Sequence, residues 1–218
     1  MRARHALFTF AIALWLCAPG FLRAQDTGFL SDYSQLQPVP GNTGLMRYAV
    51  PDVRSKLTDK VFLAPIEIWI SPTSKYRGIE PDELKKLTDE LRSVIVSELQ
   101  PRFRFVDAPE ADAINLRIAL TNVSIEKDPV RLRQFTPIGL VAKGIKAAAG
   151  VSNIRLHSAA IELEGFTPDG KERLFASVDR RTSLAGKPAP AEMRWDQVID
   201  EIRERAKRVR GNLEASAK

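Results

Sequence analysis

Hydrophobic residues recur along the chain with the spacings typical of strands and helices. Residues 61–70 (VFLAPIEIWI) are apolar almost throughout, which predicts a strand covered on both faces. Pro65 has no N–H to donate, so this strand should be bulged there or lie at an edge. From Ile114 to Leu120 apolar residues alternate with polar ones, which predicts a longer strand with one face on the core.

Two segments have helical spacing. Residues 81–99 begin with proline, continue with two acidic residues that suit the positive end of the helix dipole, and place leucine, valine and isoleucine on one stripe. A second helix is expected from about Pro190 to Val209, again with one apolar stripe.

A β-hairpin is predicted around residues 167–170 (TPDG), a strong turn signal. The register that pairs apolar residues sets Thr167 opposite Gly170 and Leu163 opposite Leu174, with Glu164 opposite Arg173 on the other face. A glycine bulge would instead shift the register by one residue and set Glu164 opposite Leu174.

The order of these elements predicts one α+β domain over residues 61–210, with a mixed or antiparallel sheet of about five strands and helices mainly on one face. Residues 25–60 have several prolines and glycines and no sustained period. They are expected to form an extended lead segment docked on the body, with Tyr33 and Leu36 among its contacts. Residues 211–218 are expected to form a C-terminal tail.

Residues 1–24 resemble an export signal, with arginines at the start and small residues at the end. The apolar run 6–17 is shorter than the roughly 20 residues that span a bilayer. Cys17 follows two bulky residues, Trp15 and Leu16, which do not suit lipoprotein processing. We therefore expect cleavage after Ala24 and a soluble periplasmic protein, with an outer-membrane lipoprotein anchored at Cys17 as the alternative.

Charge and cysteine content narrow the chemistry. The net charge of the whole chain is +6, and loss of the three leader arginines, without any acidic residue, lowers it to +3. This modest charge and the expected export argue against a nucleic-acid partner. Beyond the leader there is no cysteine, which excludes a disulfide, a thiolate nucleophile and a cysteine metal site. No metal or cofactor is predicted.

Glu67 is unusual because it is an acid in the most apolar predicted strand. If buried it needs a cationic partner, for which Arg117 or an arginine next to Asp179 is the candidate. We interpret it as a structural ion pair rather than a catalytic carboxylate.

An enzymatic hypothesis can be built on the second histidine. In the first hairpin register His157 lies opposite Arg180, close to Asp179 and Arg181. His157 with Asp179 or Glu67 could act as an acid/base pair of a small hydrolase or lyase, with the arginines binding an anion. The simpler interpretation, which we favour, is that strand ends carry charge because they reach water.

The segment 127–150 offers a different surface. Its glycine and lysine pattern does not fit a phosphate-binding loop, because Ile145 stands where that loop needs lysine. Apolar residues share one face of a possible helix, with Lys143 and Lys146 away from it, which would suit peripheral contact with lipid headgroups or a partner. A helix that simply covers the sheet is the favoured alternative.

Five segments of the chain are distinctive: 28–38 (GFLSDYSQLQP), 65–72 (PIEIWISP), 76–91 (YRGIEPDELKKLTDEL), 116–123 (LRIALTNV) and 176–181 (ASVDRR). Together they resemble a family of bacterial envelope proteins known as domain of unknown function 3313. This resemblance implies an exported protein of a Gram-negative bacterium, often a lipoprotein, and implies no activity. The chain differs from the lipoprotein pattern at residues 15–17.

The leading hypothesis is a non-enzymatic periplasmic protein that binds an envelope partner or ligand. The surfaces expected to serve this are the lead segment around Tyr33 and Leu36 and the segment 127–150. A small apolar ligand carrier is a further alternative, and it would require an apolar cavity.

Overall fold

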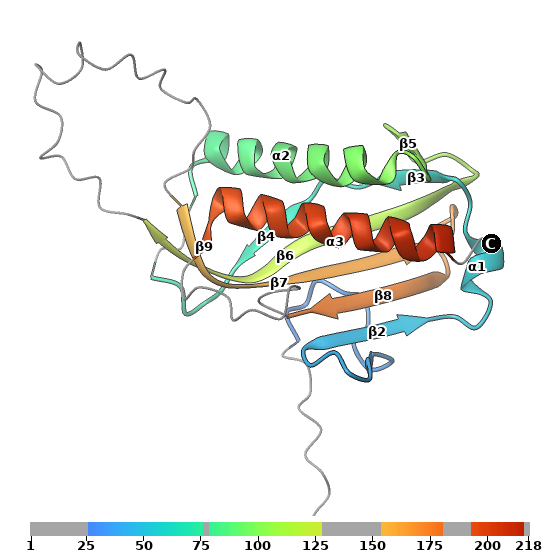
Figure 1. The fold of residues 1–218 in the computed structure, drawn as a ribbon, viewed down its shortest axis with the longest axis horizontal. Helices are drawn as coiled ribbons and strands as arrows, with labels where there is room; N and C mark the ends of the chain where they lie inside the picture. The colour runs from blue at the N-terminus through green and yellow to red at the C-terminus, as the bar shows by residue number, and fades with distance from the viewer. Residues whose placement is uncertain (1–25, 76–78, 128–153, 181–192, 216–218) are drawn as a thin grey trace, which may run out of the picture.

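The computed structural model describes residues 26–75, 79–127, 154–180 and 193–215. These residues form three helices and one open, mixed sheet of nine strands (Figure 1). The helices are α1 (Val53–Lys56), α2 (Pro81–Leu99) and α3 (Trp195–Ala215). The strands are β1 (Gln37–Pro38), β2 (Leu45–Ala49), β3 (Lys60–Leu63), β4 (Glu67–Ile70), β5 (Arg104–Val106), β6 (Ala113–Lys127), β7 (Ile154–Phe166), β8 (Arg173–Asp179) and β9 (Met193–Arg194).

The sheet confirms the predicted α+β class. Its strand order is β1-β2-β8-β7-β6-β3-β5, with β4 beside β6 and β9 beside β7. Strand β3 runs parallel to β5 and β6, and β4 runs parallel to β6, whereas the other pairs are antiparallel. There are more strands than the five expected because several contain only two to four residues, too few to show a period.

The two long helices lie side by side on one face of the sheet (Figure 1). Helix α2 has the predicted bounds, while α3 begins later than predicted because Met193 and Arg194 pair with β7 as strand β9. Trp195 is 3% exposed, and its indole N–H donates to Glu90 of α2 at 2.8 Å. This contact joins the start of α3 to α2 above the sheet.

At Asn122 the long strand β6 changes from even-numbered to odd-numbered residues on the face that it turns toward the helices. Before this point Ile118 and Leu120 belong to the core under the helices, and after it Val123 and Ile125 do. Asn122 has φ 52°, the left-handed conformation that asparagine tolerates better than most residues. The register with β7 shifts at the same place, so one bulged residue keeps both halves of β6 on the core.

The hairpin of β7 and β8 corrects the sequence prediction, because both registers considered are wrong. Leu163 lies opposite Ser177, and Glu164 lies opposite Ala176. The connection is also longer than a four-residue turn, since residues 167–172 are closed by a hydrogen bond from Thr167 N to Glu172 O at 2.9 Å.

The physical reason is that both faces of the hairpin are covered. The prediction paired apolar residues with one another on the assumption of a single buried face. In the structure Glu162 and Glu164 lie on the same face as Val178, and the lead segment covers that face. The ladder of β7 and β8 reaches only Ile161 and Asp179, so His157 is not opposite Arg180.

Candidate functional site: a docked lead segment and the groove beside it

The lead segment crosses the sheet on the face opposite the two long helices. Phe29, Leu30 and Leu36 are buried there against Ala176 and Val178. Polar groups of the same segment meet two glutamates of β7, which have no exposed surface.

Glu162 is held by hydroxyl groups alone. Its carboxylate accepts hydrogen bonds from Thr27 Oγ1 at 2.9 Å, Thr121 Oγ1 at 2.6 Å and Tyr33 OH at 2.5 Å. Within the described ranges no lysine, arginine or histidine comes within ion-pair distance of it. A buried carboxylate needs such donors because it has lost its water, and two of the three come from the lead segment.

Glu164, two residues further along the same face, is held by both charge and hydrogen bonds. It accepts from Ser31 N at 3.0 Å and Ser31 Oγ at 2.9 Å, and it pairs with Arg117 Nη1 at 2.6 Å. Arg173 lies 4.0 Å away and also donates to the carbonyl of Asp32. We call Glu162, Glu164 and their donors the carboxylate latch, because they fix residues 27–33 to the sheet.

Tyr33 has a central place in the carboxylate latch. Its hydroxyl donates to Glu162 and accepts the Leu30 N–H at 3.1 Å. Burial raises the pKa of the Tyr33 phenol above its ordinary value of 10.0, and the hydrogen bond to Glu162 raises the pKa further. Tyr33 and Leu36 were both predicted to bind a partner. In the structure Tyr33 binds Glu162 of the same chain, and Leu36 is buried in the apolar cluster beneath the lead segment.

The carboxylate latch continues to the surface through Arg117. Its guanidinium lies 4.7 Å from the centroid of the Phe29 ring. It also lies 3.5 Å from Glu67, for which the sequence suggested Arg117 as a candidate partner. Phe29 in turn meets Trp69 edge-on, with centroids 6.2 Å apart. The Trp69 indole N–H donates to Glu67 at 2.9 Å. The docked lead segment therefore supports one side of Trp69.

An open groove of about 470 Å³ lies beside Trp69, between β4 and the first half of α2. Trp69 is 36% exposed and, together with Val209, is one of the two exposed large hydrophobic side chains among the described residues. The groove is lined by Ile66, Glu67, Ile68 and Trp69 on one side and by Pro81, Leu84, Lys85 and Thr88 on the other.

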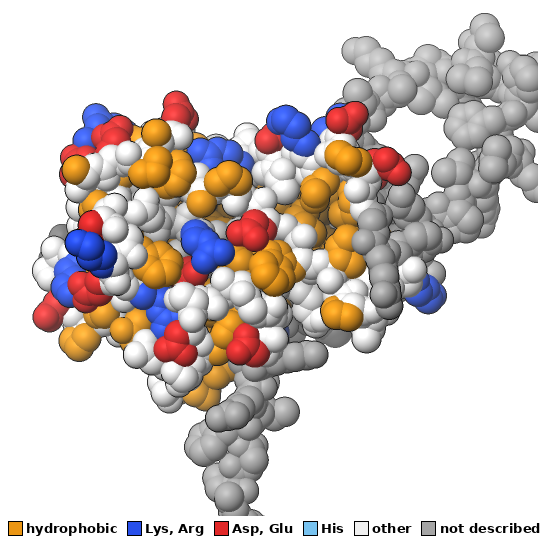
Figure 2. All heavy atoms as spheres, turned by 180° about the vertical axis from the view of Figure 1, so that it is seen from behind, with side chains coloured by type: hydrophobic (Ala, Val, Ile, Leu, Met, Phe, Trp, Pro, Cys, Tyr) orange, Lys and Arg blue, Asp and Glu red, His pale blue; other side chains and the backbone are white. Residues whose placement is uncertain are grey.

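Figure 2 shows the face turned away from the viewer in Figure 1. On its described part, hydrophobic side chains occur in small groups between lysines, arginines and acids.

The two carboxylates named in the enzymatic hypothesis lie on opposite faces of the sheet. Asp179 pairs with Arg205 of α3 at 3.6 Å, on the helix side of the sheet. Glu67 pairs with Arg117 on the opposite side, next to the lead segment. A single pocket therefore cannot hold both carboxylates. The backbone N–H of Arg180 donates a hydrogen bond to the carbonyl of Gly44.

Several predicted residues lie outside what the structure describes. The main chain of His157 belongs to β7, but its side chain is among those not described. The others are Cys17, Ala24, Lys143, Lys146 and Arg181, together with nearly all of the segment 127–150.

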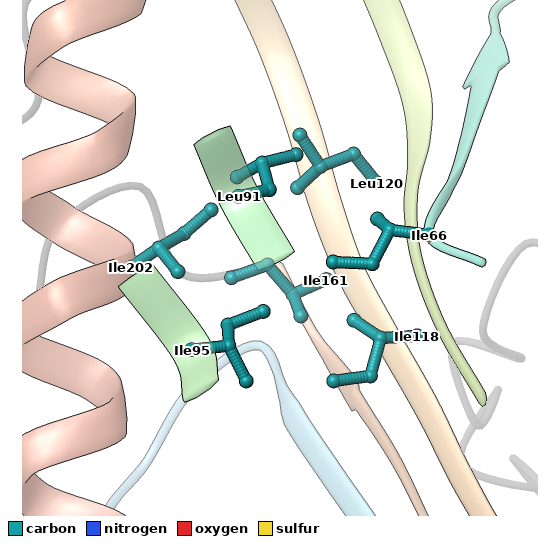
Figure 3. Close-up of a pocket in the computed structure, with 7 residues that line it drawn as sticks. All are labelled: Ile66, Leu91, Ile95, Ile118, Leu120, Ile161 and Ile202. Carbon is teal, nitrogen blue, oxygen red and sulfur yellow. The ribbon is translucent and has the colours of Figure 1, made fainter. Parts of the chain in front are cut away.

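Two further features of the described residues concern metal ions and enclosed ligands. Among these residues no cluster of three or more histidine, cysteine, aspartate or glutamate side chains could hold a metal ion. A cavity of about 20 Å³ lies between the helices and the sheet, where seven aliphatic side chains point toward one another (Figure 3). It offers space for about one water molecule, far less than a carrier of apolar ligands needs.

None of the helices within the described ranges combines the length and the apolar character that crossing a membrane requires.

Comparisons with known proteins give a family and distant structural neighbours, among them two PelC structures. A search of curated proteins found no match. The PelC dodecamer from Paraburkholderia phytofirmans aligns with a TM-score of 0.37 and 11% identity, covering 75% of this chain and 96% of that chain. A leucine-to-methionine variant of the same dodecamer gives a TM-score of 0.34 and 8% identity over 75% and 93% of the two chains. Neither likeness is close enough to support a function. The family model described as "Protein of unknown function (DUF3313)" matches residues 25–209, and the chain therefore belongs to this family.

Proposed function

We propose that the protein is a non-enzymatic binding protein of the bacterial envelope and that it holds its partner in the groove between β4 and α2. The observation that carries the proposal is the position of Trp69, a large aromatic side chain kept at the surface on the wall of an open groove. Exposed tryptophans in such grooves are typical anchors for a partner.

The carboxylate latch supports this proposal by giving the wall of the groove a rigid base. Phe29 can press against Trp69 only while the lead segment is docked, and the docking depends on the two buried glutamates. A site built on a fixed support loses less entropy when it binds. The glutamates themselves are covered and fully bonded, so they are suited to holding the segment rather than to proton transfer with a substrate.

The envelope location rests on the leader expected in residues 1–24 and on the envelope family that the sequence resembles. Residues 25–209, which match the family model, begin where the mature protein is expected to begin. Processing at Ala24 would release a protein in which the lead segment is the first ordered part of the chain.

The test is photocrosslinking of the full-length protein in the cells that make it. A photoreactive amino acid replaces Lys85, which lines the groove, or Val209, an exposed residue of α3 that does not. We expect a discrete adduct with an envelope component from position 85 and none from position 209. Equal labelling from both positions, or no adduct from position 85, would refute the groove as the binding site.

A further inference from the structure

Within the described residues, strand β4 has a neighbouring strand on one of its two edges and none on the other. It pairs with β6 from Glu67 to Ile70. Strand β5 occupies the outer edge of β3, which precedes β4 along the same side of β6. No strand of the described part of the chain continues that position beside β4. Half of the main-chain groups of β4 are therefore directed away from β6, because successive residues of a strand alternate between its two edges.

The groove runs along this edge and has a helix as its second wall. Pro81, Leu84, Lys85 and Thr88 are spaced at three or four residues, so they share the face of α2 that borders the groove. Ile66 lines the other side, next to β4. A groove between a strand edge and a helix has main-chain donors and acceptors on one side and apolar surface on the other.

An extended peptide matches both sides at once. Its main chain can pair with the edge of β4, and its side chains then point alternately into the groove and away from it. A helical partner would leave the strand edge without hydrogen bonds. The four residues of β4 extend about 13 Å at roughly 3.3 Å per residue, which suits a partner segment of four or five residues.

The charges at the rim do not favour a strongly charged partner. Lys85 is paired with Asp89 at 2.5 Å, and Glu67 is paired with Arg117. The surfaces that remain for selection are the Trp69 ring and the aliphatic side chains of the groove. Side chains entering the groove should accordingly be apolar.

We propose that β4 accepts an extended segment of a partner polypeptide as an added strand, with apolar side chains at alternate positions entering the groove between β4 and α2. This inference rests on the proposed function, because it names the class of partner for the same groove.

The experiment selects random eight-residue peptides displayed on phage against the immobilised mature protein. Counter-selection uses the variant Thr88→Trp, whose larger side chain fills the groove, and Lys86→Trp on the exposed side of α2 serves as the matched control. Urea unfolding of both variants verifies that they fold. Selected peptides should carry apolar residues at every second position and should bind Lys86→Trp as well as they bind the unmodified protein.

Methylation of peptide nitrogens then tests whether a selected peptide binds as a strand. Two versions of the peptide are compared, one methylated at its odd-numbered residues and one at its even-numbered residues. One version should bind at least tenfold more weakly and the other less than threefold more weakly, because only one set of N–H groups faces β4. Amides of β4 should also exchange at least tenfold more slowly when the peptide is bound. Equal effects of the two methylated sets, unchanged exchange in β4, or no peptide that distinguishes Thr88→Trp from Lys86→Trp would overturn the inference.

These results are separable from a failure of the proposed function. A crosslink at position 85 without strand-like binding would overturn the added strand and keep the groove as the binding site. Loss of that crosslink would overturn the site itself.

Discussion

Removing one hydroxyl group from the carboxylate latch should loosen the lead segment by about 2 kcal/mol. In the variant Tyr33→Phe, Glu162 loses the donor at 2.5 Å and Leu30 N loses its acceptor at 3.1 Å. A hydrogen bond to a charged group contributes about 1.5–3 kcal/mol, and Glu162 has no cation in the described part of the chain to compensate. We take the lower part of this range because Tyr33 is only partly buried.

The assay is amide hydrogen exchange of residues 28–36 in the mature protein, read together with urea unfolding. A loss of about 2 kcal/mol corresponds to exchange about 30-fold faster, since 1.4 kcal/mol changes an equilibrium tenfold. The circular dichroism of helices α2 and α3 during urea unfolding reports global unfolding separately. The global midpoint should change much less than the local exchange, because helices and strands keep their own core.

The matched control is Tyr48→Phe. Tyr48 packs on the same face, with Arg173 4.8 Å from its ring centroid, and no hydrogen bond reaches its hydroxyl from the residues that the structure describes. This variant should change exchange of residues 28–36 by less than threefold. The reasoning is refuted if Tyr33→Phe stays within threefold of the unmodified protein, or if both variants accelerate exchange equally.

Three further results are expected. Docking raises the pKa of the Tyr33 phenol, so the carboxylate latch should keep its full stability below pH of about 10 and should weaken as the pH rises through the higher pKa of the docked state. Carbon-13 NMR of the Tyr33 ring should show a titration midpoint at higher pH in the folded protein than in the protein unfolded in urea. Gly165→Ala would place a methyl group inside the Phe175 ring that packs across the hairpin, so urea unfolding should show a loss of about 1–3 kcal/mol that largely disappears in a Phe175→Ala background. Intact mass of the exported protein should correspond to a chain that starts at Gln25, whereas a diacylated start at Cys17 would contradict the expected processing.

The elements predicted correctly from the sequence are those in which the local residue preferences and the hydrophobic pattern point to the same structure. Residues 81–99 combine proline at the start, acids in the first turn and one apolar stripe, and the structure gives α2 the same bounds. The apolar run 61–70 was predicted as one strand that is bulged or at an edge at Pro65, and the structure instead divides it there into β3 and β4. For α2, local chemistry and packing agree.

The hairpin register and the carboxylate latch could not be predicted in the same way. The alternation of residues along β7 shows that Glu162 and Glu164 share a face. It does not show whether that face meets water or is covered by polar residues of the same protein. The available signal was the group of hydroxyl residues in the lead segment, with Ser31 and Tyr33 close together before any regular element. Their partners lie about 130 residues away in sequence, so only the fold brings them together.

The groove was missed for a related reason. The apolar run that includes Trp69 predicts a strand covered on both faces, but the strand ends up at an edge of the sheet with no neighbour on its outer side in the described residues. Hydrophobicity alone does not reveal which strand of a sheet will lie at an edge, and Pro65, which predicted a bulge or an edge, did not distinguish between the two.

The most direct test of this account is residue-resolved amide exchange in β4 of the free mature protein. An open outer edge predicts alternation along Glu67–Ile70, with amides bonded to β6 exchanging at least a hundredfold more slowly than the amides between them. The same experiment with a selected peptide should remove this difference. Uniformly slow exchange in the free protein would mean that the edge is already paired, and it would contradict both the groove and the added strand.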